Sequence, residues 1–144
     1  MKKYTKYKDT AVEWIGEIPN EWSFFSLKQI SYIKGRIGWK GLKQEEFTKQ
    51  GPYLITGQDI HDDILDWDKC YHITLERYNE SPEIMLKDQD LLFTKDGTIG
   101  KTLLIEHLPG LASLNSHLLV LRPLNNKYLS KYLQYTLKSQ YFDV

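Results

Sequence analysis

Apolar residues occur in short runs separated by glycine, proline and polar residues, a pattern that predicts many short strands and few helices. Extended segments are expected at residues 22–27, 31–34, 53–56, 64–67, 90–94, 102–105 and 118–122. The segments at 90–94 and 102–105 flank a short glycine-containing loop, so they are expected to pair as a hairpin. The pattern indicates a single α+β domain with mostly antiparallel short strands, a few short helices and a C-terminal helix.

The helical segments are short, except for the last one. A helical turn is expected at 27–30, another within the polar connection 44–50, and a helix at 74–79 with Thr74 as its N-cap. Residues 1–21 are expected to form an extended N-terminal arm. A final helix is predicted from residue 127 to 141, capped by Asn125 or Asn126. One apolar stripe follows helical spacing and consists of Tyr128, Leu129, Tyr132, Leu133 and Leu137.

Composition excludes several classes of protein. A chain of 144 residues with 41% hydrophobic residues can bury one core, and a single cysteine, Cys70, excludes a disulfide framework. No apolar run reaches the roughly 18 residues that a membrane helix needs. The N-terminal residues also lack an apolar leader segment. The sequence therefore predicts a soluble, cytoplasmic protein.

The net charge of zero, from 19 basic and 19 acidic residues, excludes binding to polyanions through overall charge. Charge is nevertheless uneven along the chain. Residues 57–90 contain ten acidic and three basic side chains. Six basic residues lie between 28 and 49: Lys28, Lys34, Arg36, Lys40, Lys43 and Lys49. This basic stretch is either a solvated face or a local surface for phosphate groups.

Motifs for common catalytic sites are absent from the sequence. No acidic residue has a lysine two positions later, as common metal-dependent nucleases require, and no G-x-G motif or P-loop occurs. A stretch rich in possible metal ligands contains His61, Asp62, Asp63, Asp66, Asp68 and His72. An acidic edge exposed to solvent is the better interpretation of these residues. Ser116 and His117 are adjacent, so on a strand they point to opposite faces and cannot form a nucleophile–base pair. We expect no catalytic residues, no metal and no cofactor.

Two glycine-rich basic loops, 35–41 and 95–101, could approach a nucleic acid closely. Phosphate contacts are expected from Arg36, Lys40, Lys43, Lys95 and Lys101, with Arg36 also suited to guanine. Trp39 is either a wedge against sugar or base, or a core anchor. Gln58 and Asn115 have the side-chain amides that recognise adenine, and His117 can donate to a base or a phosphate. Structural roles remain open for all of these side chains.

Five stretches in order, at 7–22, 27–30, 35–42, 91–101 and 112–123, together resemble the DNA-specificity subunit of type I restriction–modification enzymes. Such subunits contain two target-recognition domains joined by long helices, and each domain reads one half of a split DNA sequence. The resemblance implies that residues 1–124 form one target-recognition domain and that 125–144 begin the spacer helix. It also implies a subunit without a catalytic centre.

The partners that the resemblance implies are double-stranded DNA, the modification (methyltransferase) subunit and the restriction subunit. A chain of this length is either an excised domain or a half-length subunit that pairs with itself or with a second half through the C-terminal helix. The alternative function is a protein-interaction scaffold that docks to a helical partner through residues 127–141. The third hypothesis is a small nuclease or hydrolase built on His61, Asp62, His72 or His117.

Overall fold

The computed structural model describes residues 4–38 and 41–139, which fall into two compact units divided after Ile30. In the N-terminal unit, β1 (Tyr7–Asp9) pairs antiparallel with β2 (Glu17–Pro19). The buried Thr10 hydroxyl closes the connection by donating to the Gly16 carbonyl at 2.7 Å. The prediction of an extended arm over 1–21 is therefore wrong where these strands pair, because the chain turns back on itself.

The predicted strand at 22–27 does not form either. Its aromatic side chains are about half exposed, at 52% for Trp22, 46% for Phe24 and 52% for Phe25. Strand propensity needs a neighbouring strand to pair with, and none pairs with these residues among those described. The helical turn expected next is present as α1 (Leu27–Ile30).

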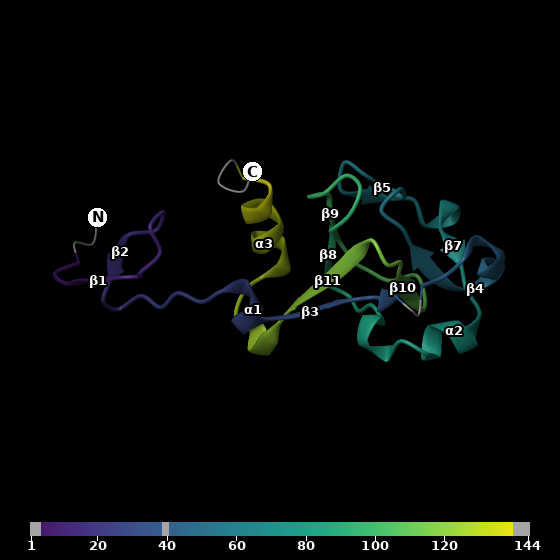
Figure 1. The fold of residues 1–144 in the computed structure, drawn as a ribbon, viewed down its shortest axis with the longest axis horizontal. Coiled ribbons are helices and arrows are strands. Elements are labelled where there is room, and N and C mark those ends of the chain that lie inside the picture. Colours follow the sequence, from purple (N-terminus) through teal and green to yellow (C-terminus); the bar gives the residue numbers. More distant parts are fainter. Residues whose placement is uncertain (1–3, 39–40, 140–144) are drawn as a thin grey trace. The chain divides into compact units, whose positions relative to one another are not determined.

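The second unit contains a four-stranded antiparallel sheet (Figure 1). Its order is β3 (Ser31–Gly35), β11 (Leu118–Pro123), β8 (Leu91–Thr94) and β9 (Thr102–Leu104). The expected hairpin is confirmed, because β8 pairs directly with β9.

A smaller sheet has the order β10 (Ala112–Leu114), β4 (Thr48–Ile55) and β7 (Tyr71–His72). β10 and β4 run parallel, whereas β4 and β7 are antiparallel. A further short pair joins β5 (Ile60–His61) and β6 (Ile64–Leu65). The fold class is as predicted, although β5, β7 and β10 were not expected from the sequence.

The main hydrophobic core draws residues from both larger sheets. Ile55 of β4, Leu92 of β8 and Val120 of β11 all lie in it with no exposed surface. Leu54, on the opposite face of β4, packs in a second cluster with Ile73 and Tyr78. Both faces of β4 are therefore packed, which holds the strand in place. The loop that follows β4 begins at a well-defined position.

The predicted helix α2 (Leu75–Asn79) begins where the sequence indicated. The Thr74 hydroxyl accepts a hydrogen bond from the Arg77 amide at 3.2 Å, so the N-cap prediction is confirmed. Three-residue 3-10 helices form at η2 (Gln44–Glu46), η3 (Trp67–Lys69), η4 (Pro82–Ile84) and η5 (Leu124–Asn126). The helical turn predicted within 44–50 corresponds to η2.

Replacing Thr74 with alanine is expected to lower the free energy of unfolding by about 1 kcal/mol, because the Arg77 amide loses its acceptor. Urea unfolding measures this change. Thr74→Ser is the matched control and should retain most of the stability, since its hydroxyl can make the same bond. Equal stability of the alanine variant and the parent would contradict the cap.

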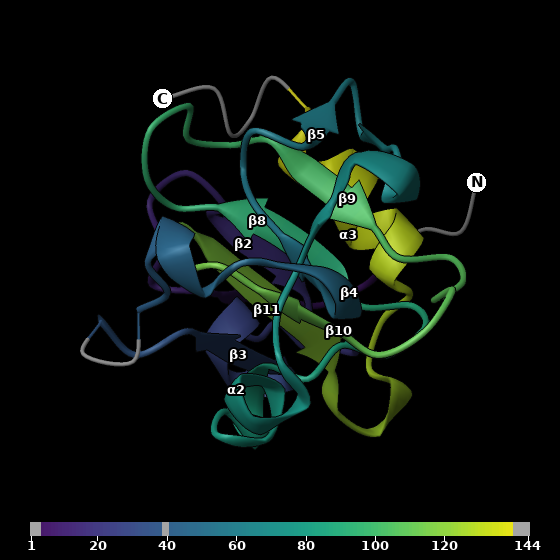
Figure 2. The ribbon, with the colours of Figure 1, turned by 90° about the vertical axis from the view of Figure 1, so that its right-hand side faces the viewer.

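The last helix, α3 (Ser130–Leu137), packs against β8, β9 and β11 (Figure 2). It begins later than the predicted residue 127. Neither Asn125 nor Asn126 caps it, because both adopt left-handed backbone angles in η5.

The exposed and buried faces of α3 differ from the predicted stripe. Gln134 is buried, whereas Leu129 is 76% exposed at the N-cap and Tyr132 is 68% exposed. Leu133 and Leu137 are half-buried. Residues 140–141 of the predicted helix lie outside the described residues. No helix in the described part of the chain has the length and apolar character needed to cross a membrane.

Candidate functional site

Three loops meet at one edge of the second unit because of the strand pairing. Parallel β4 and β10 align Ile55 with Leu114, so residues 56–59 and 115–117 leave the two strands side by side. Thr94, at the end of β8, pairs with Leu118 at the start of β11. The Asn115 amide donates to the Ile55 carbonyl at 2.9 Å. Residues 56–59, 95–101 and 115–117 therefore surround one site.

These loops border an open cleft of about 620 Å³. A facing wall is supplied by Gln44, Phe47 and Tyr71. The aromatic rings of Phe47 and Tyr71 pack with their centroids 4.6 Å apart. Four of the predicted site residues line the cleft: Gln58, Lys101, Asn115 and His117. The sequence did not indicate the facing wall, because only the tertiary fold brings η2 and β7 opposite the loops.

The turn at 56–59 is held by the Asp59 carboxylate. One carboxylate oxygen accepts from the Thr56 amide at 2.7 Å and from the Thr56 hydroxyl at 2.8 Å. The Asp59 amide donates back to the Thr56 carbonyl at 3.2 Å. These bonds fix the turn between its two ends and leave the Gln58 side chain exposed on the cleft.

The 95–101 loop is organised by Thr94, which is 2% exposed. Its hydroxyl donates to the Thr98 carbonyl at 2.6 Å and accepts from the Lys101 amide at 3.0 Å. Gly97 has a φ of +73°, a backbone conformation that favours glycine. Thr94 therefore ties the two ends of this loop together.

Charged side chains at the cleft are partly paired with each other. Nδ1 of His117 lies 3.4 Å from a carboxylate oxygen of Asp96, and both side chains are more than half exposed. The Lys101 ammonium group donates to the Ile60 carbonyl at 3.1 Å and to the Gly57 carbonyl at 3.5 Å. Lys101 therefore braces the 56–59 turn. Lys95 and Lys43 are exposed.

Arg36 is buried, and the prediction that it contacts phosphate or guanine is wrong for this fold. Only 3% of it is exposed. Its guanidinium donates to the Leu114 carbonyl at 3.0 Å, to the Ser113 hydroxyl at 3.1 Å and to the Ser81 hydroxyl at 3.4 Å. Burial, followed by the nearby charge of Arg77, lowers the pKa of Arg36 from its usual value. Arg36 thus anchors the first glycine-rich loop to β10.

The predictions for Trp39 and Lys40 lie outside the described residues. Gly35, where that loop begins, pairs with Leu119 of β11. The side chain of Ile37 is 43% exposed. The described part of the first loop therefore contributes an anchor through Arg36 and an exposed apolar side chain, but no residue that lines the cleft.

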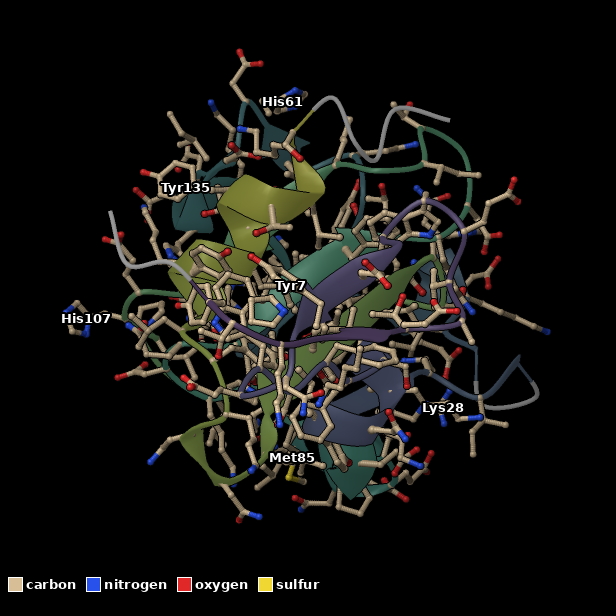
Figure 3. All side chains as sticks on the ribbon, turned by 90° about the vertical axis from the view of Figure 1, so that its left-hand side faces the viewer. Tyr7, Lys28, His61, Met85, His107 and Tyr135 are labelled. Carbon is tan, nitrogen blue, oxygen red and sulfur yellow. The ribbon has the colours of Figure 1, made fainter. Side chains whose placement is uncertain are left out.

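The residues considered for metal binding or catalysis do not assemble into a site. In the described part of the chain, no three His, Cys, Asp or Glu side chains lie close enough to hold a metal ion. His61 lies at the surface on β5 (Figure 3), while Nδ1 of His72 contacts the Gly51 carbonyl at 2.8 Å. The Ser116 hydroxyl lies 3.4 Å from the Asn115 side chain, and His117 faces Asp96.

The only thiol in the chain is also unsuited to chemistry at neutral pH. Cys70 is 6% exposed. Burial, together with the carboxylates of Asp59 and Asp66, raises the pKa of its thiol to about 12. Because the thiolate is the reactive form, Cys70 is expected to resist alkylation while the protein is folded.

Comparison with known proteins adds a family and a fold. The family model described as type I restriction modification DNA specificity domain matches residues 19–143. No curated protein matches the sequence.

Two solved structures are similar in fold. The HsdS subunit from Thermoanaerobacter tengcongensis has a TM-score of 0.65 at 15% identity, covering 91% of this chain and 29% of that one. A chain from the structure on complex assembly and conformational transition of the type I R-M system has a TM-score of 0.63 at 17% identity, covering 83% and 28%. This chain therefore spans less than a third of the length of either relative.

Proposed function

Because the chain belongs to the family of type I restriction modification DNA specificity domains, we propose that it binds duplex DNA and reads one half of a split recognition sequence. The cleft edge formed by residues 56–59, 95–101 and 115–117 is the proposed reading surface. The observation that carries this proposal is the convergence of exposed donor and acceptor side chains from three separate loops. Base-edge readout needs such side chains on elements that can enter the major groove.

Charge on the same edge supports contact with the DNA backbone. Lys95 follows Thr94 directly, and its amide donates to the His117 carbonyl at 3.0 Å, which places its backbone beside the cleft. Lys43 precedes η2, which supplies Gln44 to the facing wall. Exposed lysines that flank base-reading side chains suit the phosphate contacts that position a protein on DNA.

The chain supplies recognition in this proposal, and chemistry is left to its partners. Methylation and cleavage would belong to the modification and restriction subunits of a type I system, which this chain would direct to the DNA.

A random-sequence duplex library tests the function directly. The chain is incubated with the library at low salt, and the retained DNA is sequenced. We expect enrichment of one defined motif of a few base pairs. Uniform retention that disappears on adding salt would contradict sequence reading by this chain, because only phosphate contacts would be present. No retention at any salt concentration would contradict DNA binding altogether.

Replacing Lys95 with alanine is expected to weaken binding about equally to all sequences. It should also reduce the slope of log affinity against log salt concentration by about 1, because one phosphate contact is lost. Fluorescence anisotropy of a labelled duplex over a salt series measures both effects. Lys69→Ala is the matched control, since Lys69 is exposed on η3 and lies outside the three loops of the proposed reading surface. Equal salt slopes for Lys95→Ala and Lys69→Ala would contradict the contact.

Protein docking through α3 is the second candidate function, and it is compatible with the first. Leu129, Tyr132 and Tyr135 are 76%, 68% and 65% exposed. Figure 3 shows Tyr135 projecting away from the ribbon of α3. Exposed apolar groups that lie together often mark an interface, here with a partner subunit, a second half-subunit or a second copy. Sedimentation over a dilution series tests the last case, and a strictly monomeric chain would exclude the homodimer.

A further inference from the structure

We infer that Gln58 is the side chain in the cleft that reads a base edge, and that the base it selects is adenine; this inference rests on the proposed function. Three features of the cleft support this assignment: the rigidity of the turn that presents Gln58, the hydrogen-bonding state of the amides, and the space in front of them.

The turn that contains Gln58 is held by two side chains, Asp59 within the turn and Lys101 from the neighbouring loop. The Asp59 carboxylate binds both the amide and the hydroxyl of Thr56 at 2.7 and 2.8 Å. From the neighbouring loop, the Lys101 ammonium group reaches the Ile60 carbonyl at 3.1 Å and the Gly57 carbonyl at 3.5 Å. Such a turn presents its side chain from a fixed backbone position, so little backbone freedom remains to be lost on binding.

The amides of Asn115 and Gln58 differ in what they can still bind. The Asn115 side-chain oxygen accepts from the Ser116 amide at 2.7 Å and from the Ser116 hydroxyl at 3.4 Å. Asn115 can therefore donate to a ligand, but its acceptor is already occupied. No hydrogen-bond partner is found for the Gln58 side chain among residues 4–38 and 41–139, so both its oxygen and its nitrogen remain available.

The free oxygen and nitrogen of the Gln58 amide together fit adenine. In the major groove adenine presents its N6 amino donor beside its N7 acceptor, and one carboxamide with both ends available satisfies the two together. The Asn115 oxygen already accepts two hydrogen bonds, so it has no lone pair left for this bidentate contact. A base edge has room in front of this amide, since Gln58 and Gly97 both line the open cleft of about 620 Å³.

Gln50, in β4, provides a matched control for this assignment. Its side chain is exposed and does not line the cleft. Gln50→Ala therefore removes the same chemical group from a place outside the proposed reading surface. If Gln58 reads the base, only Gln58→Ala changes the specificity.

The library selection is repeated with the parent chain, Gln58→Ala and Gln50→Ala. We expect the parent to enrich a motif containing adenine at one position, and Gln58→Ala to accept other bases there while the remaining positions persist. Gln50→Ala should enrich the parent motif. A parent motif that is unchanged in Gln58→Ala would overturn the inference and leave the proposed function standing. Failure of the parent to enrich any motif would overturn both.

A duplex with 7-deazaadenine at that position tests the atoms involved, since this base lacks the N7 acceptor. The parent should bind it about tenfold more weakly than the adenine duplex. Gln58→Ala should bind the two duplexes equally, because the contact is already absent. An equal loss in both proteins would overturn the assignment to Gln58. Urea unfolding of Gln58→Ala should match that of the parent, which separates the effect from misfolding.

Discussion

Replacing Asp90 with alanine is expected to lower the free energy of unfolding by about 3–4 kcal/mol, the largest effect that we predict for one substitution. Asp90 has no exposed surface. Its two carboxylate oxygens accept from Nε and a terminal nitrogen of Arg122 at 2.6 and 2.7 Å, and one of them also accepts from the Lys87 amide at 2.8 Å. The alanine variant leaves a guanidinium and a backbone amide without their acceptors.

The remaining contacts of Arg122 do not compensate for this loss. One terminal nitrogen donates to the Met85 carbonyl at 3.1 Å, and the guanidinium lies 5.2 Å from the centre of the Tyr32 ring. The hydrogen bonds that Arg122 donates to Asp90 raise the pKa of Arg122 above its usual value, as expected for a favourable pair. A quarter of the Arg122 side chain is exposed, so water can solvate part of its unpaired charge in the alanine variant. The expected loss of stability is therefore near the lower end of the range for broken buried ion pairs.

Urea unfolding followed by fluorescence measures the loss at Asp90. With a denaturant slope of about 1.5 kcal/mol per M, the midpoint should fall by about 2 M. Asp68→Asn is the control, since Asp68 is an exposed acidic residue and its substitution should change stability by less than about 0.5 kcal/mol. Similar midpoints for Asp90→Ala and Asp68→Asn would show that the buried pair contributes little.

Replacing Arg36 with alanine is expected to lower the free energy of unfolding by about 3 kcal/mol, about 1 kcal/mol for each hydrogen bond lost. The Leu114 carbonyl and the hydroxyls of Ser81 and Ser113 would all lose their donor in a region closed to solvent. Arg36→Lys should also be destabilised, because one ammonium group cannot reproduce the fork geometry of the guanidinium.

The reactivity of Cys70 gives a second readout for Arg36→Ala. The buried thiol, with a pKa of about 12, should be alkylated only when the structure opens, so the variant should react faster than the parent. Lys95→Ala is the control, because Lys95 is exposed and its loss should leave the alkylation rate unchanged. If Arg36→Ala instead kept parental stability and lost only affinity for DNA, the anchoring role would be wrong.

The sequence by itself determined the local elements whose signals lie within a few residues. Thr74 indicated the start of α2, because its own hydroxyl caps the helix. The apolar runs at β8 and β11 indicated buried strands. The glycines at 97 and 100 indicated a loop, and both adopt a positive φ in the structure. The family was also visible in the sequence, because five short stretches in one order carry the resemblance.

The tertiary structure alone decided which of these residues form the site. The sequence treated Arg36, Lys101 and Gln58 alike as candidates for DNA contact. The fold buries Arg36 among Ser81, Ser113 and Leu114, uses Lys101 as a brace and leaves Gln58 exposed. The physical reason is distance along the chain: the partners of Arg36 lie 45 to 78 residues away, and no local pattern encodes where such partners meet. Hydrogen bonding between distant residues thus separated the structural cations from the side chains available to a ligand.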